Sequence, residues 1–490
     1  MTNMKQDQEN IETILTDVVH HAAKFFSSLE ERAVTSQAYN VPASTLSEVG
    51  QGAQSTLQYF SQHYAEGLSG SAGSRYLGFV TGGATPASIV GDWLVSIYDQ
   101  NLSNTQDSVA GSMELTTIDM LKDLLLLSED YQGTFVSGAT MANFVGLAQA
   151  REWVAQYYGK STAMDGLFDI PPIKIVSGTP HSSIVKATSM LGLGRKSIHL
   201  IPCQEQREAI DITKLQQFLE DNQQEPCVVV ANAGTVNTVD FDDLLAIGKL
   251  KKRYNFWLHV DAALGGFAAC SPKYYHLVEG INYADSITID AHKWLNVPYD
   301  AAMQFTRHQS LQIAVFQNNA AYLDSSLENP NFSDLTPENS RRFRALPAWF
   351  SLQAYGKQGY QQLIEQNVLL AQQLGQKIEQ SDQFTLLAPV RLNVVCFAIN
   401  HEALTVEMNK QFLKTLNQQG KVFMTPTLYQ GVPAMRAAFS NWRTTTEDNY
   451  YLGSTNDSYT ILFPRVPLIY DKSYQCTLNG HLIYLSKFNK

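Results

Sequence analysis

The feature that most constrains the fold of this chain is a series of short apolar segments that alternate with helical patterns. Strands are predicted at 133–137 (GTFVS), 173–178 (IKIVSG), 197–203 (SIHLIPC), 227–232 (CVVVAN), 256–262 (FWLHVDA) and 286–291 (SITIDA). Strands that are apolar along their whole length and alternate with helices indicate a mostly parallel sheet covered on both faces. We therefore predict an α/β fold.

The regions around this core differ in pattern. Apolar residues at helical spacing between Ile11 and Phe26 predict an N-terminal helix, and one long helical region is expected from about Ala87 to Leu127. A long amphipathic helix is expected from about Gly356, leading into a smaller α+β part. We expect an N-terminal helical arm (1–86), a large cofactor-binding domain (87–357), a small C-terminal domain (358–449) and an atypical tail (450–490) that lacks a helical period.

Composition and charge exclude several classes of protein. The chain is 44% hydrophobic and 17% charged, which is ordinary for a globular protein. Its net charge of -11 argues against a nucleic-acid partner and against docking to an anionic membrane. No apolar run approaches the ~20 residues that cross a bilayer, and the polar N-terminus does not resemble a signal peptide. The scattered cysteines suggest neither a metal site nor a disulfide framework, so we expect reduced thiols and a cytoplasmic location.

Residues able to do chemistry follow the predicted strands at their carboxyl ends, where open parallel sheets bind ligands. They are Ala139 and Thr140 after Gly138, His181 in PHSS, Thr235, Asp261, and the pair His292–Lys293. Each has an ordinary alternative: a helix cap, a structural histidine, an N-cap aspartate or a solvated lysine. Together, at one edge of one sheet, they predict a site.

The residue types suit pyridoxal 5'-phosphate (PLP). The start of a helix at Ala139 and Thr140 can bind a phosphate through backbone N–H groups, and His181 can stack on a planar ring. Asp261 can pair with the pyridine nitrogen, and Lys293 can bond to the aldehyde. A metal fits worse because lysine is rarely a metal ligand. Neither GxxxxGK[ST] nor GxGxxG follows a strand.

The motifs WLHVDAALGG (257–266) and ADSITIDAHKWLNVPYD (284–300) resemble those of the PLP-dependent group II amino-acid decarboxylases. This family includes the aromatic-L-amino-acid and glutamate decarboxylases. The resemblance covers about residues 10–447, with PHSS, ANAGTVNTVDFDDL and SRRFRALPAW as further matching pieces. It implies an aspartate-aminotransferase-like fold (fold-type I), a homodimer, and decarboxylation of an L-amino acid.

The resemblance also implies roles for individual residues. Lys293 matches the Schiff-base lysine, Asp261 the partner of the pyridine nitrogen and His181 the ring-stacking histidine. Tyr322 in AAYLD matches a tyrosine of a mobile loop that protonates Cα after carbon dioxide leaves. The remaining expected contacts are Ala139, Thr140, Thr235 and His292 for the cofactor, and Thr81 and Phe79 for the substrate pocket.

Some positions depart from the better-known animal members. Asp290 and Ala291 stand in place of Asn-Pro, and Val236 replaces a second threonine, so the bond to the ring hydroxyl rests on Thr235 or is lost. Gly78 replaces a pocket tyrosine and is expected to open space. Aromatic amino acids are ranked first as substrates. The alternatives are an acidic or diamino acid (glutamate, 2,4-diaminobutyrate), oxidative deamination or transamination, and an inactive homologue that acts as a binding subunit.

Overall fold

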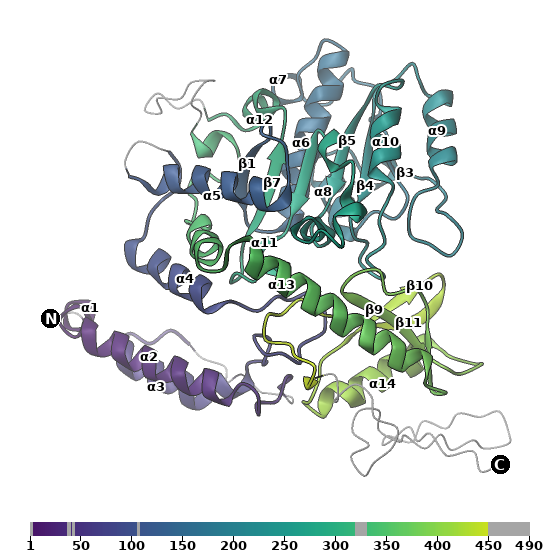
Figure 1. The fold of residues 1–490 in the computed structure, drawn as a ribbon. Coiled ribbons are helices and arrows are strands. Elements are labelled where there is room, and N and C mark those ends of the chain that lie inside the picture. Colours follow the sequence, from purple (N-terminus) through teal and green to yellow (C-terminus); the bar gives the residue numbers. More distant parts are fainter. Residues whose placement is uncertain (1–2, 37–40, 42–44, 105–107, 319–330, 449–490) are drawn as a thin grey trace, which may run out of the picture.

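The structure, a computed structural model, describes residues 3–36, 41, 45–104, 108–318 and 331–448 (Figure 1). Its helices are α1 (Asn3–Glu9), α2 (Ile11–Ser28), α3 (Ala53–His63), α4 (Pro86–Tyr98), α5 (Ala110–Leu125), α6 (Ala139–Tyr157), α7 (Thr162–Asp165), α8 (Ser182–Met190), α9 (Ile212–Asp221), α10 (Leu244–Leu250), α11 (Ala291–Trp294), α12 (Gln309–Phe316), α13 (Ala345–Glu379) and α14 (Val406–Gln418). Its strands are β1 (Gln132–Val136), β2 (Ile175–Ser177), β3 (Ile198–Leu200), β4 (Cys227–Asn232), β5 (Phe256–Asp261), β6 (Ser286–Ile289), β7 (Ala302–Thr306), β8 (Phe384–Leu386), β9 (Val394–Ile399), β10 (Thr425–Tyr429) and β11 (Val432–Ala438).

A seven-stranded sheet forms the centre of the molecule, in the order β1-β7-β6-β5-β4-β2-β3. The pairs from β6 to β3 are parallel, and β7 runs antiparallel to both of its neighbours, β6 and β1. This confirms the predicted mostly parallel α/β sheet. The sequence did not predict β7. Because β7 is antiparallel on both sides, β1 points the same way as β6, and their carboxyl ends lie at one edge.

Helices cover both faces of this sheet, which is why its central strands carry apolar residues without alternation. Successive residues of a strand point to opposite faces. In β4, Val228 and Val230 belong to the core under α6 and α8, whereas Val229 and Ala231 belong to the core on the other face. All six residues of β4 and all six of β5 are buried.

The helical region expected from about Ala87 to Leu127 is divided in the structure. It consists of two helices, α4 and α5, separated by residues 99–109. The first helix ends where Asp99 adopts a left-handed conformation (φ 47°, ψ 47°), which stops helical hydrogen bonding. The intervening sequence, DQNLSNTQDS, is rich in Asp, Asn and Ser, residues that favour turns over helix interiors.

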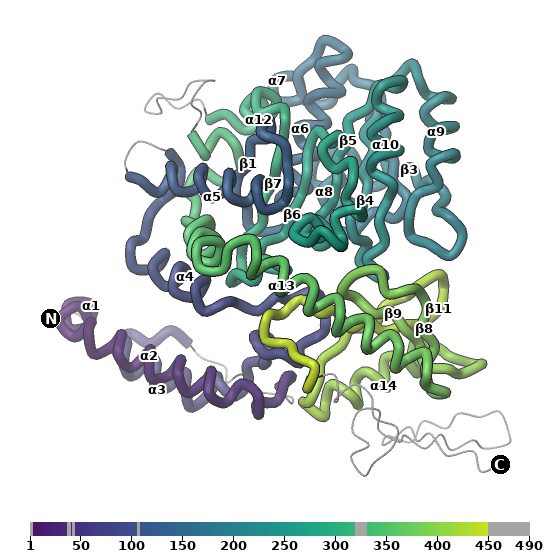
Figure 2. Tube along the Cα trace, viewed as in Figure 1, coloured from purple at the N-terminus to yellow at the C-terminus, as the bar shows by residue number. Residues whose placement is uncertain are grey.

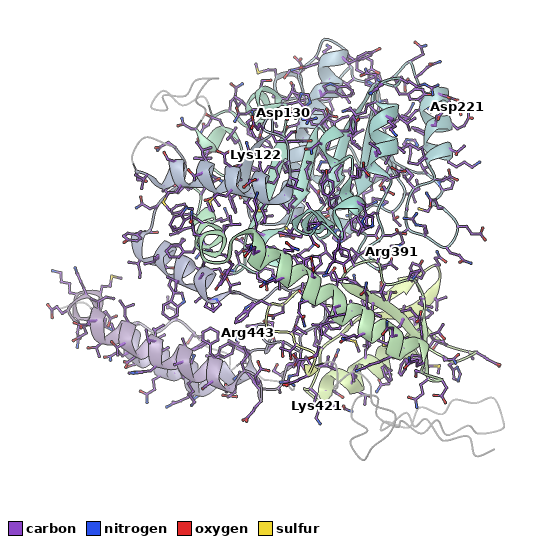
Figure 3. The ribbon with its side chains drawn as sticks, viewed as in Figure 1. Lys122, Asp130, Asp221, Arg391, Lys421 and Arg443 are labelled. Carbon is purple, nitrogen blue, oxygen red and sulfur yellow. The ribbon has the colours of Figure 1, made fainter. Side chains whose placement is uncertain are left out.

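A second sheet, antiparallel in the order β10-β11-β9-β8, lies beyond the carboxyl edge of the first (Figure 1). Helix α13 connects the two: it packs against α4 and α5 and also against β8 and β9. It bends at Gly356, whose φ of 55° is outside helical geometry. Arg391 bridges the sheets, with its Nε 3.2 Å from Oδ1 of the buried Asp240 (Figure 3). The bend lies beside the expected boundary at residue 357; the domain boundaries themselves stay predictions.

The polypeptide after β11 returns to the segment that precedes α4 (Figure 2). Ser440 Oγ donates a hydrogen bond to the carbonyl of Thr81 (3.1 Å), and Asn441 Nδ2 donates to the carbonyl of Gly73 (3.0 Å). The loop around Thr81 is thereby held against the second sheet. Helices α1 to α3 form an arm set apart from both sheets (Figure 1). Among the described residues, no helix is both long and apolar enough to span a membrane.

Candidate active site

The residues singled out from the sequence meet at the carboxyl edge of the large sheet, facing the second sheet. Asp261 is the last residue of β5, and the short helix α11 after β6 carries Lys293. His181 caps the start of α8, directly after β2. Burial lowers the pKa of His181; the carboxylates of Asp261 and Asp290 oppose this shift, and the cations Lys293 and Arg436 add to it. Hydrogen bonds through Asn143 and Ser183 join Asp261 to His181.

Lys293 is held by a closely packed backbone. Trp294 Nε1, on the next residue, donates a hydrogen bond to Asn367 Oδ1 of α13 (2.8 Å), and this fixes α11. The loop with the GFVTGG motif (78–83) packs against the backbone of Lys293. A Cβ on Gly82 would lie 1.7 Å from the carbonyl oxygen of Lys293. Only glycine fits there. The side-chain nitrogen of Lys293 lies 3.6 Å from Oδ2 of Asp290.

His292 is oriented by its neighbours. Its Nδ1 accepts a hydrogen bond from the backbone N–H of Ala301 (3.3 Å), so a neutral ring carries its proton on Nε2. That nitrogen lies 3.1 Å from Oδ1 of Asp290. One face of the ring packs on Tyr299, with 4.2 Å between the ring centroids. A Cβ on Gly138 would lie 3.4 Å from His292 Cε1, so the start of α6 is adjacent.

Ala139 and Thr140, the residues expected to bind a phosphate, lie at the start of α6. They are the first two residues of this 19-residue helix, and Gly138 is its N-cap. N–H groups in the first turn of a helix have no partner within the helix, and the helix dipole favours an anion there. The absence of a side chain at Gly138 leaves this end open toward His292.

Asp261 is buried and oriented. Its Oδ2 accepts a hydrogen bond from Asn143 Nδ2 (3.0 Å), and its Oδ1 accepts one from the backbone N–H of Ala263 (3.3 Å). These bonds leave further lone pairs on the carboxylate for a cationic partner. A protonated pyridine nitrogen is such a partner.

Thr235 was expected to contact the cofactor, but its hydroxyl is hydrogen-bonded within the protein. Its hydroxyl donates to Glu208 Oε2 (2.6 Å) and accepts from the backbone N–H of Asp240 (2.9 Å). A cofactor contact through this hydroxyl would require the pair with Glu208 to break. Val236, the next residue, instead offers its carbonyl oxygen to Arg436 Nη1.

The expectation that Gly78 opens space is wrong. A Cβ at this position would lie 2.3 Å from Cε1 of Phe423, so the ring of Phe423 already fills the volume. Phe423 stacks on Tyr76 with centroids 4.6 Å apart and lies 5.9 Å from Phe79. An aromatic group therefore stands beside Gly78, contributed by another part of the chain.

The two expected pocket residues differ in exposure. Thr81 is buried, and its hydroxyl lies 3.3 Å from the hydroxyl of Tyr299. Phe79 has a positive φ of 56°, and 58% of its surface is exposed. Tyr322 lies outside the described residues.

Arg436, which the sequence reading missed, lies in β11 and reaches the site from the second sheet. Burial lowers its pKa, and its Nε has no hydrogen-bond partner among the described residues. Among the described residues, Arg436 also forms no ion pair with a carboxylate. The guanidinium is partly buried and donates to the carbonyl of Val236, but it has no carboxylate partner among the described residues, which suits it to an anion. One charged residue in the otherwise apolar strand VPAMRAA was the available signal.

A lysine, a buried carboxylate, a histidine, a helix start and an arginine without a carboxylate partner together fit PLP and an amino acid. The fold and the site thus define a cofactor-dependent α/β enzyme. The described residues contain no group of three or more His, Cys, Asp or Glu side chains placed to hold a metal ion.

Comparison with known proteins identifies the family. Residues 36–400 match the model of the pyridoxal-dependent decarboxylase conserved domain, and the chain belongs to that family. It is therefore a PLP-dependent amino-acid decarboxylase, a carboxy-lyase.

Individual relatives agree with this. The chain is 30% identical over 389 residues to an aromatic-L-amino-acid decarboxylase of Bacillus atrophaeus, covering 76% of this chain and 78% of the relative. It is 28% identical to an L-2,4-diaminobutyrate decarboxylase of Acinetobacter baumannii, covering 67% of each. Its fold matches the crystal structure of Oryza sativa TDC with PLP and tryptamine, with a TM-score of 0.81 at 23% identity, over 88% of this chain and 94% of that one.

Proposed function

We propose that this decarboxylase acts on aromatic L-amino acids and that Lys293 holds its cofactor. The main support for this proposal is that Lys293, Asp261 and His181 lie together at one edge of the sheet. The similarity to an aromatic-L-amino-acid decarboxylase supports the substrate class, as do the rings of Tyr76 and Phe423 beside the site. Decarboxylation of a diamino or acidic amino acid is the alternative, which the diaminobutyrate relative keeps open.

Each residue has a proposed part in the reaction. Lys293 would hold PLP covalently through Nζ, the first turn of α6 and His292 would bind its phosphate, and His181 would stack on its ring. The bound cofactor supplies a sink for the electrons left at Cα when the carboxylate departs. Asp261 would keep a proton on the ring nitrogen.

The other groups would act on the substrate. Arg436 is proposed to bind a carboxylate of the amino acid, since its guanidinium is partly buried beside the site without an acidic partner. Thr81 and Phe79 would line the pocket. Tyr322 is proposed to deliver the proton to Cα from a segment outside the described residues.

We propose a homodimer and a cytoplasmic location. Helix α2 exposes Ile11, Leu15 and Val19, and α4 exposes Val90, Trp93 and Ile97. Both sets recur at helical spacing, so each forms an apolar stripe, and a second copy of the chain would cover them. The free state of Cys203, Cys227, Cys270 and Cys396 is consistent with a reducing compartment. Sedimentation of wild type and of Leu15→Glu tests the dimer: a monomeric wild type would contradict it.

A panel assay tests the activity. Purified protein with PLP is offered single L-amino acids, and carbon dioxide and amine are measured together. Aromatic substrates should turn over fastest, and Lys293→Ala should lose both turnover and the borohydride-sensitive visible absorbance. Lys273→Ala, at an ion pair with Glu365 outside the site, is the matched control. Turnover of only acidic or diamino substrates would overturn the aromatic assignment, and a wild-type rate in Lys293→Ala would overturn the role of Lys293.

A further inference from the structure

A continuous line of buried hydrogen bonds runs from the core of the large domain to the carboxylate of Asp261. Trp257 Nε1 bonds to Ser286 Oγ (2.9 Å), which lies 2.8 Å from His259 Nδ1. His259 Nε2 lies 2.9 Å from Asn143 Oδ1. Trp257, Ser286, His259 and Asn143 are all buried, on β5, β6 and α6. Gly146 of α6 makes room for the imidazole, since a Cβ there would lie 2.7 Å from His259 Cε1.

The carboxylate of Asp261 fixes the direction of the bonds in this line. A carboxylate only accepts, so Asn143 donates to it through Nδ2 and turns Oδ1 toward His259 Nε2. The neutral imidazole therefore carries its proton on Nε2, and its Nδ1 accepts the proton of Ser286 Oγ, which itself accepts the indole N–H of Trp257. Burial lowers the pKa of His259 to about 4, so the ring stays neutral and the direction holds near neutral pH.

The amide of Asn143 consequently turns its nitrogen toward the site. Asn143 Nδ2 donates to Asp261 Oδ2 and to Ser183 Oγ, each at 3.0 Å. Ser183 Oγ lies 2.7 Å from His181 Nδ1, which also accepts the backbone N–H of Ser183 (3.2 Å). His181 Nδ1 is thus an acceptor, and its neutral ring carries the proton on Nε2. One amide therefore orients both the carboxylate and the stacking imidazole.

We propose that Asn143 is a positioning residue for the cofactor, orienting Asp261 and His181 together, with its own amide oxygen held by Nε2 of His259. This rests on the proposed roles of Asp261 and His181. It deepens them, because the two side chains act as one unit and not as independent contacts. In this proposal Asn143 acts through Asp261 and His181 and not through a contact of its own with the cofactor.

Asn143→Asp tests the proposal, because it keeps the shape of the side chain and replaces the donor with a carboxyl group facing Asp261. The matched control is Asn409→Asp, in which another buried amide donor, bonded to the carbonyl of Ala434 (2.7 Å), is lost in the second sheet. Loss of a buried bond to a charged group predicts about ten-fold weaker PLP binding or more for Asn143→Asp. Asn409→Asp should keep wild-type affinity for PLP.

Measurements on the PLP complex separate positioning from a general folding defect. Titration of cofactor-free protein with PLP gives the affinity, and visible circular dichroism of the bound cofactor reports its orientation. Asn143→Asp should change both and should lower kcat more than it raises KM. A wild-type protein that forms no Lys293-dependent absorbance overturns the proposed function. Normal absorbance in wild type, with unchanged affinity and dichroism in Asn143→Asp, overturns only the present inference.

Ser183→Ala keeps the proposal testable if Asn143→Asp does not fold. It removes only the hydroxyl between Asn143 and His181, while the backbone N–H of Ser183 still reaches His181 Nδ1. The cofactor dichroism should change, with a smaller loss of PLP affinity than in Asn143→Asp. Identical dichroism and affinity in wild type and Ser183→Ala would overturn the joint positioning.

Discussion

The side-chain nitrogen of Lys293 lies 3.6 Å from Oδ2 of Asp290, a carboxylate that is almost completely buried. The other oxygen of Asp290 lies 3.1 Å from His292 Nε2, so one acid stands between the two residues of the His-Lys pair. By its resemblance to the group II decarboxylases, the sequence has Asp290 where the better-known animal members have asparagine. This chain therefore places a negative charge beside the groups proposed to bind a phosphate-bearing cofactor.

We expect Asp290→Asn to bind PLP more tightly, by about three- to ten-fold, because a like charge near the phosphate is removed. Titration of the cofactor-free protein with PLP measures this. Asp130→Asn, at an ion pair with Arg307 away from the site, is the control and should be unchanged. Weaker PLP binding in Asp290→Asn would show that the carboxylate instead organises Lys293 and His292.

Asp261→Ala should slow decarboxylation by orders of magnitude while the protein still folds. The physical reason is loss of the carboxylate proposed to keep the ring nitrogen protonated, which weakens the electron sink. The check is kcat together with a thermal melt of the same preparation. A folded variant with near-normal turnover would remove Asp261 from this role.

The pair Arg341–Glu114 should dominate the stability of the large domain near β1. Their side chains are fully buried with Nη2 and Oε1 2.9 Å apart, and Arg341 also bonds to the carbonyl of Phe135 (2.6 Å). Glu114→Gln leaves a buried cation without its carboxylate, which costs about 3–5 kcal/mol. Urea unfolding of the cofactor-free protein measures it. The exposed pair Glu220–Arg253 is the comparison, and Glu220→Gln should lower the free energy of unfolding much less, because solvent screens the exposed charges. Equal losses in the two variants would contradict the prediction.

Tyr322→Phe should change the product more than the release of carbon dioxide. A phenol with a pKa of about 10 is protonated at neutral pH and can donate to a carbanion, whereas phenylalanine cannot. Without that proton the carbanion persists and reacts with dioxygen, giving aldehyde, ammonia and peroxide. Amine and aldehyde are quantified together under air. Wild-type amine formation without aldehyde would exclude Tyr322 as the donor.

The parts of the fold that the sequence predicted are those where local pattern and burial agree. Strand β4 begins and ends at the predicted residues because its whole length is apolar and buried. Strand β7 was missed, since its central Gln304 is polar, yet the side chain is fully buried in the sheet. The break between α4 and α5 was missed because counting apolar residues ignores turn-forming residues such as Asp99.

The residues of the site likewise fall into those that the sequence predicted and those that it missed. Lys293, Asp261 and His181 follow strands directly, so the topology of a parallel sheet places them together without knowledge of packing. Asn143 and Arg436 are polar residues inside a helix and a strand, where the usual expectation is a solvated side chain. Only the tertiary arrangement shows Asn143 fully buried and Arg436 turned toward the site from a distant sheet.

Helix α13 packs against both parts of the molecule, so the way they pack together determines the distance between Lys293 and Arg436. Lys293 is fixed to this helix through Trp294 and Asn367, and Arg436 belongs to the sheet that packs on the same helix. Arg391 and Asp240 form an ion pair between the two sheets. A substitution of Arg391 can thus change the distance between the Lys293 amine and the Arg436 guanidinium without contacting either group. The spacing between these two groups therefore depends on the contact between the sheets as well as on the groups themselves.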